Sequence, residues 1–279
     1  SNDTVQNLLV SMVLEASSFF DAQIVSEHLT YQYDPFSNSL LLALLSQDTA
    51  ISSIRRNETS LLTKGSTFVA LLKSCSDTRN AKLGSQIHTI IAKHKVLWSD
   101  LFLRNSLVDM YAKCGLFEKA RDVFEDISGP DVVSWNALIG GYANHQDGEE
   151  SLKCFEQMQV EGVFPNAITY VCSLKASASV GYACKGSQIH ARIVRASLLE
   201  TNIHVGNALV DMYGRCGLCM RAQQLFDDLP SRDVISWNAL ITGYVKHGND
   251  VEALICFEQM QIEKIRPTVI TFTCALQAC

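Results

Sequence analysis

The stretch DVVSWNALIGGYANHQDGEESLKCFEQMQVEGVFP, residues 131–165, decides the fold, because most of it occurs twice. It returns as DVISWNALITGYVKHGNDVEALICFEQMQIEKIRP at residues 233–267. The two copies lie 102 residues apart and share 21 of 35 positions without a gap. Chance does not produce such a match, so the chain contains a duplicated unit and its fold is a repeat fold.

The composition is that of a protein with a substantial core. Of the 279 residues, 47% are apolar and 19% are charged, which excludes a disordered chain. The longest purely aliphatic run, residues 40–45, is too short to cross a bilayer, so we expect no membrane partner. The chain starts without a methionine and stops inside a repeat. We therefore expect a piece of a longer protein, whose targeting peptide would lie outside it.

The charge and the cysteines restrict the kind of site that we expect. The net charge of −6 has the wrong sign for non-specific binding to phosphates, although the local field of a groove decides binding. Cys216 and Cys219 form a CxxC, but no second pair follows at zinc-finger spacing, so we expect neither a metal nor a cofactor. Three pairs of cysteines occupy repeat-equivalent positions, which indicates reduced core residues rather than a disulfide scaffold. These pairs are Cys114 and Cys216, Cys154 and Cys256, and Cys172 and Cys274.

The repeated part of the chain begins at residue 64. Units 64–99, 100–130 and 131–165 have lengths of 36, 31 and 35 residues, and they recur as 166–201, 202–232 and 233–267. A partial unit, 268–279, begins the cycle again. Residues 1–63 do not match the repeat. We interpret them as a divergent helical segment, either a degenerate repeat or a cap that shields the first unit, with an independent domain as the alternative.

Each unit is expected to form two helices. In residues 131–165, Trp135, Leu138 and Tyr142 recur at helical spacing, and Gly162 and Pro165 end the second helix. An isolated pair of helices this short cannot bury its apolar face. Stacked pairs bury a continuous core, so the sequence predicts an all-α fold, an α-solenoid of stacked helix–turn–helix pairs.

The cycle of unit lengths resembles the pentatricopeptide repeat family in its plant-type PLS subclass. DVVSWNALIGGYANH followed by FEQMQVEGVFP resembles the P motif. ITYVCSLKASASVG with GSQIHARIV resembles the long L motif, and VGNALVDMYGRCG with AQQLFDDLP the short S motif. The resemblance covers residues 64–279, and all three motifs occur twice in the same order. By this resemblance the L units are 64–99 and 166–201, the S units 100–130 and 202–232, and the P units 131–165 and 233–267, followed by the partial L unit 268–279. It implies a right-handed superhelix.

The resemblance also implies a function. Members of the family bind single-stranded RNA in mitochondria or chloroplasts, and one repeat reads one base through two side chains. For this chain it implies site recognition for C-to-U RNA editing. The implied base-reading pairs are Asn105 with Asp131, Asn136 with Asn166, Asn207 with Asp233, and Asn238 with Thr268. The L repeats place Val69 with Asp100 and Val171 with Asn202. Since valine cannot hydrogen-bond a base edge, we expect weaker readout there.

The side-chain chemistry suits pyrimidines. An asparagine amide supplies a donor and an acceptor in one plane, so it can pair with the Watson–Crick edge of a pyrimidine. By the resemblance, Asn with Asp favours U, and Asn with Asn favours C or tolerates U. The implied site, from 5′ to 3′, is any–U–C/U–any–U–pyrimidine. Bases would be sandwiched between the second residues of successive first helices, where aromatic rings could add stacking. These residues are Phe102, Val133, Ile168, His204 and Ile235.

Structural interpretations compete with these roles. The four asparagines could be internal hydrogen-bonding residues of the first helices, and Asp131 and Asp233 stand where helix N-caps are useful. Trp135 and Trp237 lie among core positions, so we assign them to the core rather than to base stacking. His88 and His190 recur inside GSQIH, without companions at ligand spacing, and we interpret them as packing or surface residues.

The sequence shows no enzyme motif of the editing kind. A cytidine-deaminase domain carries HxE followed by PCxxC, and neither motif occurs in these residues. We therefore expect no catalytic centre in this segment, and a deaminase would lie beyond residue 279 or on a partner protein. The alternative function, from a different class, is a protein–protein scaffold of the tetratricopeptide type, with which the acidic balance is compatible.

Overall fold

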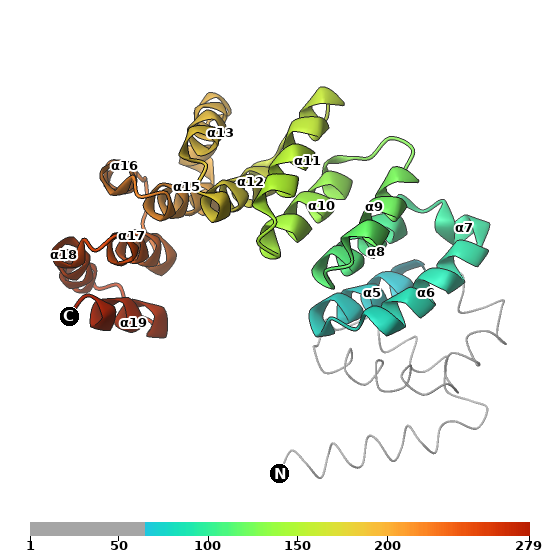
Figure 1. Cartoon of the computed structure of the whole chain (residues 1–279), viewed down its shortest axis with the longest axis horizontal. Coiled ribbons are helices and arrows are strands. Elements are labelled where there is room, and N and C mark those ends of the chain that lie inside the picture. Colours follow the sequence, from blue (N-terminus) through green and yellow to red (C-terminus); the bar gives the residue numbers. More distant parts are fainter. Residues whose placement is uncertain (1–64) are drawn as a thin grey trace, which may run out of the picture. The chain divides into compact units, whose positions relative to one another are not determined.

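The computed structural model describes residues 65–279, which are helical with short connections (Figure 1). The chain falls into two compact units, residues 1–74 and 75–279, so the boundary lies inside the helix α5 (Gly65–Thr78). The interpretation of residues 1–63 as a degenerate repeat or cap lies outside the described residues. Across the described part, no helix has both the length and the apolar content needed to cross a bilayer.

The second compact part of the chain, residues 75–279, is a stack of helix pairs. The first helices of successive pairs are α8 (Leu101–Lys113), α10 (Val132–Asn144), α12 (Ala167–Val180), α15 (Ile203–Arg215), α17 (Val234–Lys246) and α19 (Val269–Gln277). The second helices are α6 (Ala81–Lys93), α9 (Phe117–Glu125), α11 (Gly148–Val160), α13 (Ala183–Arg195), α16 (Cys219–Asp227) and α18 (Asp250–Ile262).

The first helices form a continuous row. Each of α8, α10, α12, α15 and α17 packs against the first helix that follows it, and α9, α11, α13, α16 and α18 each pack against the first helix of their own pair. Because neighbouring pairs share this contact, every pair buries its apolar stripe against the next one. The expected solenoid of stacked helix pairs is therefore confirmed.

The lengths of the units follow from their helices. In the 35-residue units the second helix has 13 residues, whereas in the 31-residue units it has nine. The 36-residue units contain a third, four-residue helix, namely α7 (Lys95–Trp98) and α14 (Leu198–Thr201). The expectation of two helices for each unit is wrong here. A single turn is too short to display helical periodicity, so the sequence pattern did not reveal it.

Small residues set the spacing of the row. A Cβ atom added to Gly141 in α10 would lie 2.4 Å from the Cβ of Ala112 in α8, so only glycine fits there. The equivalent contact, Gly214 against Gly243, brings two backbones together. Beyond α11, Gly162 adopts φ of +78°, the left-handed conformation that ends a helix, as its place before Pro165 predicted.

The tryptophans belong to the core, as expected. Trp135 and Trp237 are 1% and 2% exposed. Each packs edge-on against a phenylalanine of the preceding unit, Phe124 or Phe226, with ring centroids 4.6 Å apart. They join adjacent units and are not available to stack on a base.

Candidate nucleic-acid interface

The residues that the sequence pairs are in direct contact in the structure. In the S units, Nδ2 of Asn105 donates a hydrogen bond to Oδ1 of Asp131 at 3.3 Å, and Asn207 donates to Asp233 at 3.1 Å. Each asparagine lies in a first helix, and each aspartate is the N-cap of the next first helix. The pair therefore spans two successive units.

The P units repeat this arrangement with other cap residues. Nδ2 of Asn136 donates to Oδ1 of Asn166 at 3.2 Å, and Nδ2 of Asn238 donates to the hydroxyl of Thr268 at 3.2 Å. Asn166 caps α12 and Thr268 caps α19. All four pairs that the sequence indicated thus have the same geometry at equivalent places in the row.

A third residue completes each pair, and the sequence reasoning missed it. A serine or threonine in the first turn of the next helix donates its hydroxyl to Oδ1 of the asparagine. This bond joins Ser134 to Asn105, Thr169 to Asn136, Ser236 to Asn207 and Thr271 to Asn238, at 2.6–2.7 Å. The same hydroxyl accepts the backbone N–H of the cap residue and closes a capping box. We call each set of three residues a triad.

The triad could have been found from a pattern. The four first helices that follow an asparagine unit open DVVS, NAIT, DVIS and TVIT, so Ser or Thr recurs three residues after the cap. In the L units the asparagine is replaced by Val69 or Val171. In the first helix that follows each of them, the equivalent of the hydroxyl residue is apolar as well, Leu103 or Val205, and it is 0% exposed. Asparagine and hydroxyl therefore occur together or not at all.

The triad fixes which polar groups remain for a ligand. Oδ1 of Asn105 is occupied by the hydroxyl of Ser134, so the amide presents Nδ2, which carries two hydrogens and uses one for Asp131. All hydrogen bonds that the described residues make to Asp131 use Oδ1, which leaves Oδ2 as an open acceptor. The bonds to Asn166 likewise use its Oδ1, which leaves its Nδ2 as an open donor.

The two aspartates of the triads, Asp131 and Asp233, are held in the ionised form. Burial opposes the charge of Asp131, but the hydrogen bonds from Ser134, Asn105 and Val133 outweigh it and lower the pKa of the carboxyl. The pKa of Asp233 is lowered in the same balance, by its bonds from Ser236, Asn207 and Ile235. A carboxylate that is ionised at neutral pH accepts hydrogen bonds and donates none.

The competing interpretation of the asparagines is correct in one respect. Asn105 and Asn207 are only 7% and 5% exposed, and every asparagine of a triad bonds within the protein. Asn136 and Asn238 are half-buried. The cap residues are the more exposed partners in the S units, so a ligand there meets the aspartate first. The capping role of Asp131 and Asp233 is confirmed by their bonds to the first-turn N–H groups.

The L units lack a polar pair. Asp100 caps α8 through the N–H of Phe102 at 2.8 Å, and Asn202 caps α15 through the N–H of His204 at 3.0 Å. Their partners Val69 and Val171 are half-buried valines. The cap side chains remain, without a second polar side chain to orient them.

Exposed apolar side chains line the row beside the triads. The expected sandwich residues Phe102, Val133, Ile168 and Ile235 are 73%, 51%, 60% and 53% exposed, and His204 is exposed as well. Each is the second residue of a first helix. Ile270 of α19, 59% exposed, occupies the same place and was missed because its unit is incomplete. A series of exposed apolar side chains is typical of an interaction surface.

Cations lie toward the far ends of the same helices. Lys113 and Arg215 are paired with Asp109 and Asp211, each at 2.8 Å. Lys175 and Lys246 contact neutral oxygens, the amide of Asn144 and the carbonyl of Arg215. Within the described residues these two lysines have no carboxylate partner, so their charge is available to an anion.

Two histidines are hydrogen-bonded to tyrosines, and the cysteines form no disulfide. His88 and His190 are hydrogen-bonded to Tyr111 and Tyr213, each at 2.9 Å. Burial lowers the pKa of both imidazoles, so they are neutral near pH 7. All ten cysteines are free thiols, and burial raises the pKa of Cys154 to about 11. In residues 65–279 no three metal-ligating side chains gather at one place.

Sequence comparisons identify the repeats. The PPR repeat family matches residues 130–179 and 232–279, and the PPR repeat matches residues 103–129 and 207–234. A mitochondrial pentatricopeptide repeat-containing protein of Arabidopsis thaliana is 35% identical over 286 residues, which cover 100% of this chain and 27% of the relative. A chloroplastic one from the same plant is 37% identical over 213 residues, which cover 76% of this chain and 34% of the relative.

The fold is shared with a solved structure. The crystal structure of the pentatricopeptide repeat protein PPR10 in complex with an 18-nt psaJ RNA element superposes with a TM-score of 0.68 at 16% identity. The match covers 92% of this chain and 39% of that one.

A second mitochondrial relative from Arabidopsis thaliana is 30% identical over 287 residues. This chain spans about a quarter to a half of the length of these three relatives.

Proposed function

Because the chain belongs to the pentatricopeptide repeat family, we propose that its triads bind single-stranded RNA and read one base in each S and P unit. The observation that carries this proposal is the orientation of the triads. Four equivalent asparagine–cap pairs lie in one row, with their open polar groups beside exposed apolar side chains. The alternation of unit types further leads us to place the chain in the PLS subclass.

The open groups discriminate between pyrimidines. Both U and C carry a carbonyl at O2, which can accept from Nδ2 of the asparagine. U has a donor at N3, whereas C has an acceptor there. Oδ2 of Asp131 or Asp233 accepts from N3–H of U, and Nδ2 of Asn166 donates to N3 of C. The hydroxyl of Thr268 can do either, so its unit takes either pyrimidine.

This chemistry gives the site any–U–C/U–any–U–pyrimidine from 5′ to 3′. The L units, with Val69 and Val171, tolerate any base. The second residues of the first helices would hold the bases between them, and base stacking on a side chain contributes roughly 1–3 kcal/mol. Lys175 and Lys246 would contact phosphates, which position the strand and carry no sequence information.

The cellular role follows from the family. The relatives named above are mitochondrial or chloroplastic proteins, and we assign this chain to an organelle. We propose that the segment selects a site for C-to-U editing. It supplies recognition only, and the deaminase that attacks the cytosine is another part of the protein or a separate partner.

Gel shifts with short RNA strands test the proposal. A strand with the core U–C–N–U should bind more tightly than a scrambled strand of equal composition at physiological salt. Equal binding of the two strands would contradict base readout by the triads. If neither strand bound while the protein captured a peptide, the protein–protein scaffold would be the better account.

A further inference from the structure

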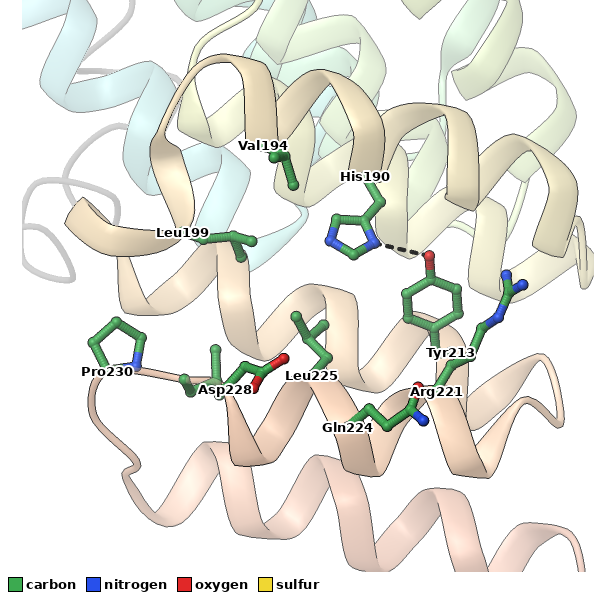
Figure 2. Close-up of a pocket in the computed structure, with 10 residues that line it drawn as sticks. His190, Val194, Leu199, Tyr213, Arg221, Gln224, Leu225, Asp228 and Pro230 are labelled. Carbon is green, nitrogen blue, oxygen red and sulfur yellow. Dashed lines mark hydrogen bonds between the residues drawn. The ribbon is translucent and has the colours of Figure 1, made fainter.

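A cavity lies on the side of the second helices, apart from the triads. It has a volume of about 510 Å³ and opens between α13 and α14 on one side and α15 and α16 on the other (Figure 2). Val194, Leu199 and Leu225 line it with apolar groups, and His190 and Tyr213 line it with aromatic rings. None of its lining residues belongs to a triad or to the exposed apolar series.

Two of the residues that line the cavity hold their aromatic rings in a fixed geometry. Nδ1 of His190 is hydrogen-bonded to the hydroxyl of Tyr213 at 2.9 Å, as the dashed line in Figure 2 shows. The two rings meet edge to face, with centroids 5.6 Å apart and planes at 68°. Both rings line the cavity.

The first copy of the repeat contains the same two rings and a third. His88 and Tyr111, which are 102 residues earlier, meet at 5.6 Å and 69° with the same hydrogen bond. There Trp98 of α7 stacks on His88, with centroids 5.5 Å apart and planes at 10°. In the second copy the residue equivalent to Trp98 is Glu200, which is exposed. The chain thus shows both a filled and an open form of one site.

The leucine before each of these two positions also differs in exposure between the copies. Leu97, beside Trp98, is buried at 6% exposure, whereas its equivalent Leu199 is half-exposed and lines the cavity. The smaller cavity of about 350 Å³ near His88 is lined by residues of α6 only. Tryptophan therefore occupies the space between the short third helix and the histidine when the chain supplies it.

We propose that the cavity at His190 is a docking site for an aromatic side chain, most favourably tryptophan, of a partner protein. The incoming ring would stack on His190 as Trp98 stacks on His88. Asp228, at the rim, can accept a hydrogen bond from an indole N–H, and the guanidinium of Arg221 can lie over the ring. A tryptophan that enters from a partner would complete the cluster that the first copy completes internally.

The partner is a polypeptide rather than a second RNA segment for two reasons. The occupant that the chain itself provides is an amino-acid side chain. The cavity is also lined by one carboxylate, Asp228, and one guanidinium, Arg221, so its lining has no excess of positive charge to hold the phosphate attached to a nucleobase.

The test uses the whole 279-residue chain and N-acetyl-tryptophanamide as the probe. Binding is followed by the imidazole resonances in NMR spectra and by equilibrium dialysis. The wild type should bind one equivalent, with shifts at His190 and not at His88. N-acetyl-leucinamide, which cannot stack, should bind roughly threefold or more weakly.

Two variants, one that opens the first site and one that removes the second, complete the test. Trp98→Ala should open the first site and raise the stoichiometry to two, with new shifts at His88. His190→Ala should abolish binding in an otherwise wild-type chain. Circular dichroism would establish that each variant keeps its helices. The proposal is overturned if Trp98→Ala leaves the stoichiometry at one, if leucinamide binds as well as tryptophanamide, or if uridine monophosphate binds there instead.

Discussion

Removal of one buried hydroxyl should weaken both the stability of the protein and its readout of a base. Oγ of Ser236 is 0% exposed, donates to Oδ1 of Asn207 at 2.6 Å and accepts the N–H of Asp233 at 3.1 Å. Ser236→Ala leaves two polar groups without these partners. An unsatisfied buried group costs about 1–3 kcal/mol, and the N–H of Asp233 is near enough to the surface to reach water. We therefore expect a loss of about 2 kcal/mol.

The loss is measurable by thermal unfolding. For a unit of this size, about 2 kcal/mol lowers Tm by roughly 4–8 °C. The base preference gives a second readout. Without the serine hydroxyl, the amide of Asn207 can turn and present Oδ1, so discrimination at the fifth base of the site should fall more than overall affinity does. Binding is compared on strands with U, C, A or G at that base.

Two matched variants separate this role from general damage. Ser236→Thr should restore both readouts, because Thr169 and Thr271 make the same bonds in the P units. Ser231→Ala removes an exposed hydroxyl from the same region and should change neither. If Ser236→Ala unfolds at the wild-type temperature and keeps its preference for U, the triad has no such function.

Three other perturbations test the fold, the charge and the cations. Gly141→Ala places a Cβ 2.4 Å from the Cβ of Ala112, so overpacking should cost about 1–3 kcal/mol in urea unfolding, and an unchanged midpoint would contradict the packing of α8 on α10. The lowered pKa of Asp131 stabilises the fold above the unfolded pKa of about 4, and this stability is lost as pH falls through the folded pKa. In the variant Asp131→Asn, the free energy of unfolding should therefore decrease less steeply below pH 4 than in the wild type. Parallel curves of unfolding free energy against pH for the two proteins would refute this prediction. Lys175→Ala and Lys246→Ala should each reduce the salt dependence of RNA binding by about one phosphate contact on all sequences alike, whereas a change in base preference would argue against a phosphate role.

The helix pairs were predictable because their signals are long. The recurrence of 35 residues at a fixed offset defines the length of the repeated unit. The spacing of apolar residues around Trp135 predicts the first helix of that unit and the face that this helix turns to the core. The short third helices α7 and α14 were not predictable, because four residues contain no period. The cavity at His190 could not be predicted either, since it depends on the absence of one ring at position 200.

The asparagine–cap pairs that we propose to read bases could be predicted from their positions, whereas the hydroxyl residue that completes each triad was not predicted. Asn105 and Asp131 are 26 residues apart, and only the recurrence of the same types at 207 and 233 connects them. Ser134 looked like an ordinary first-turn residue of α10, a place where serine is common for capping alone. Its bond to Asn105 of the preceding unit depends on how α8 and α10 pack against each other, and this packing cannot be read from the sequence of either helix alone.

Binding of two RNA strands by the wild type and by Asp233→Asn tests the central claim most directly. The variant should keep its triad, because Asn166 makes the same bonds in the P unit. It exchanges the open acceptor Oδ2 for the open donor Nδ2. The strands are N–U–C–N–U–Y and N–U–C–N–C–Y, which differ only at the fifth base. We predict that the wild type binds the U strand roughly fivefold or more tightly and that the variant prefers the C strand by a similar factor. If the two proteins have the same preference, the cap residue does not read the base.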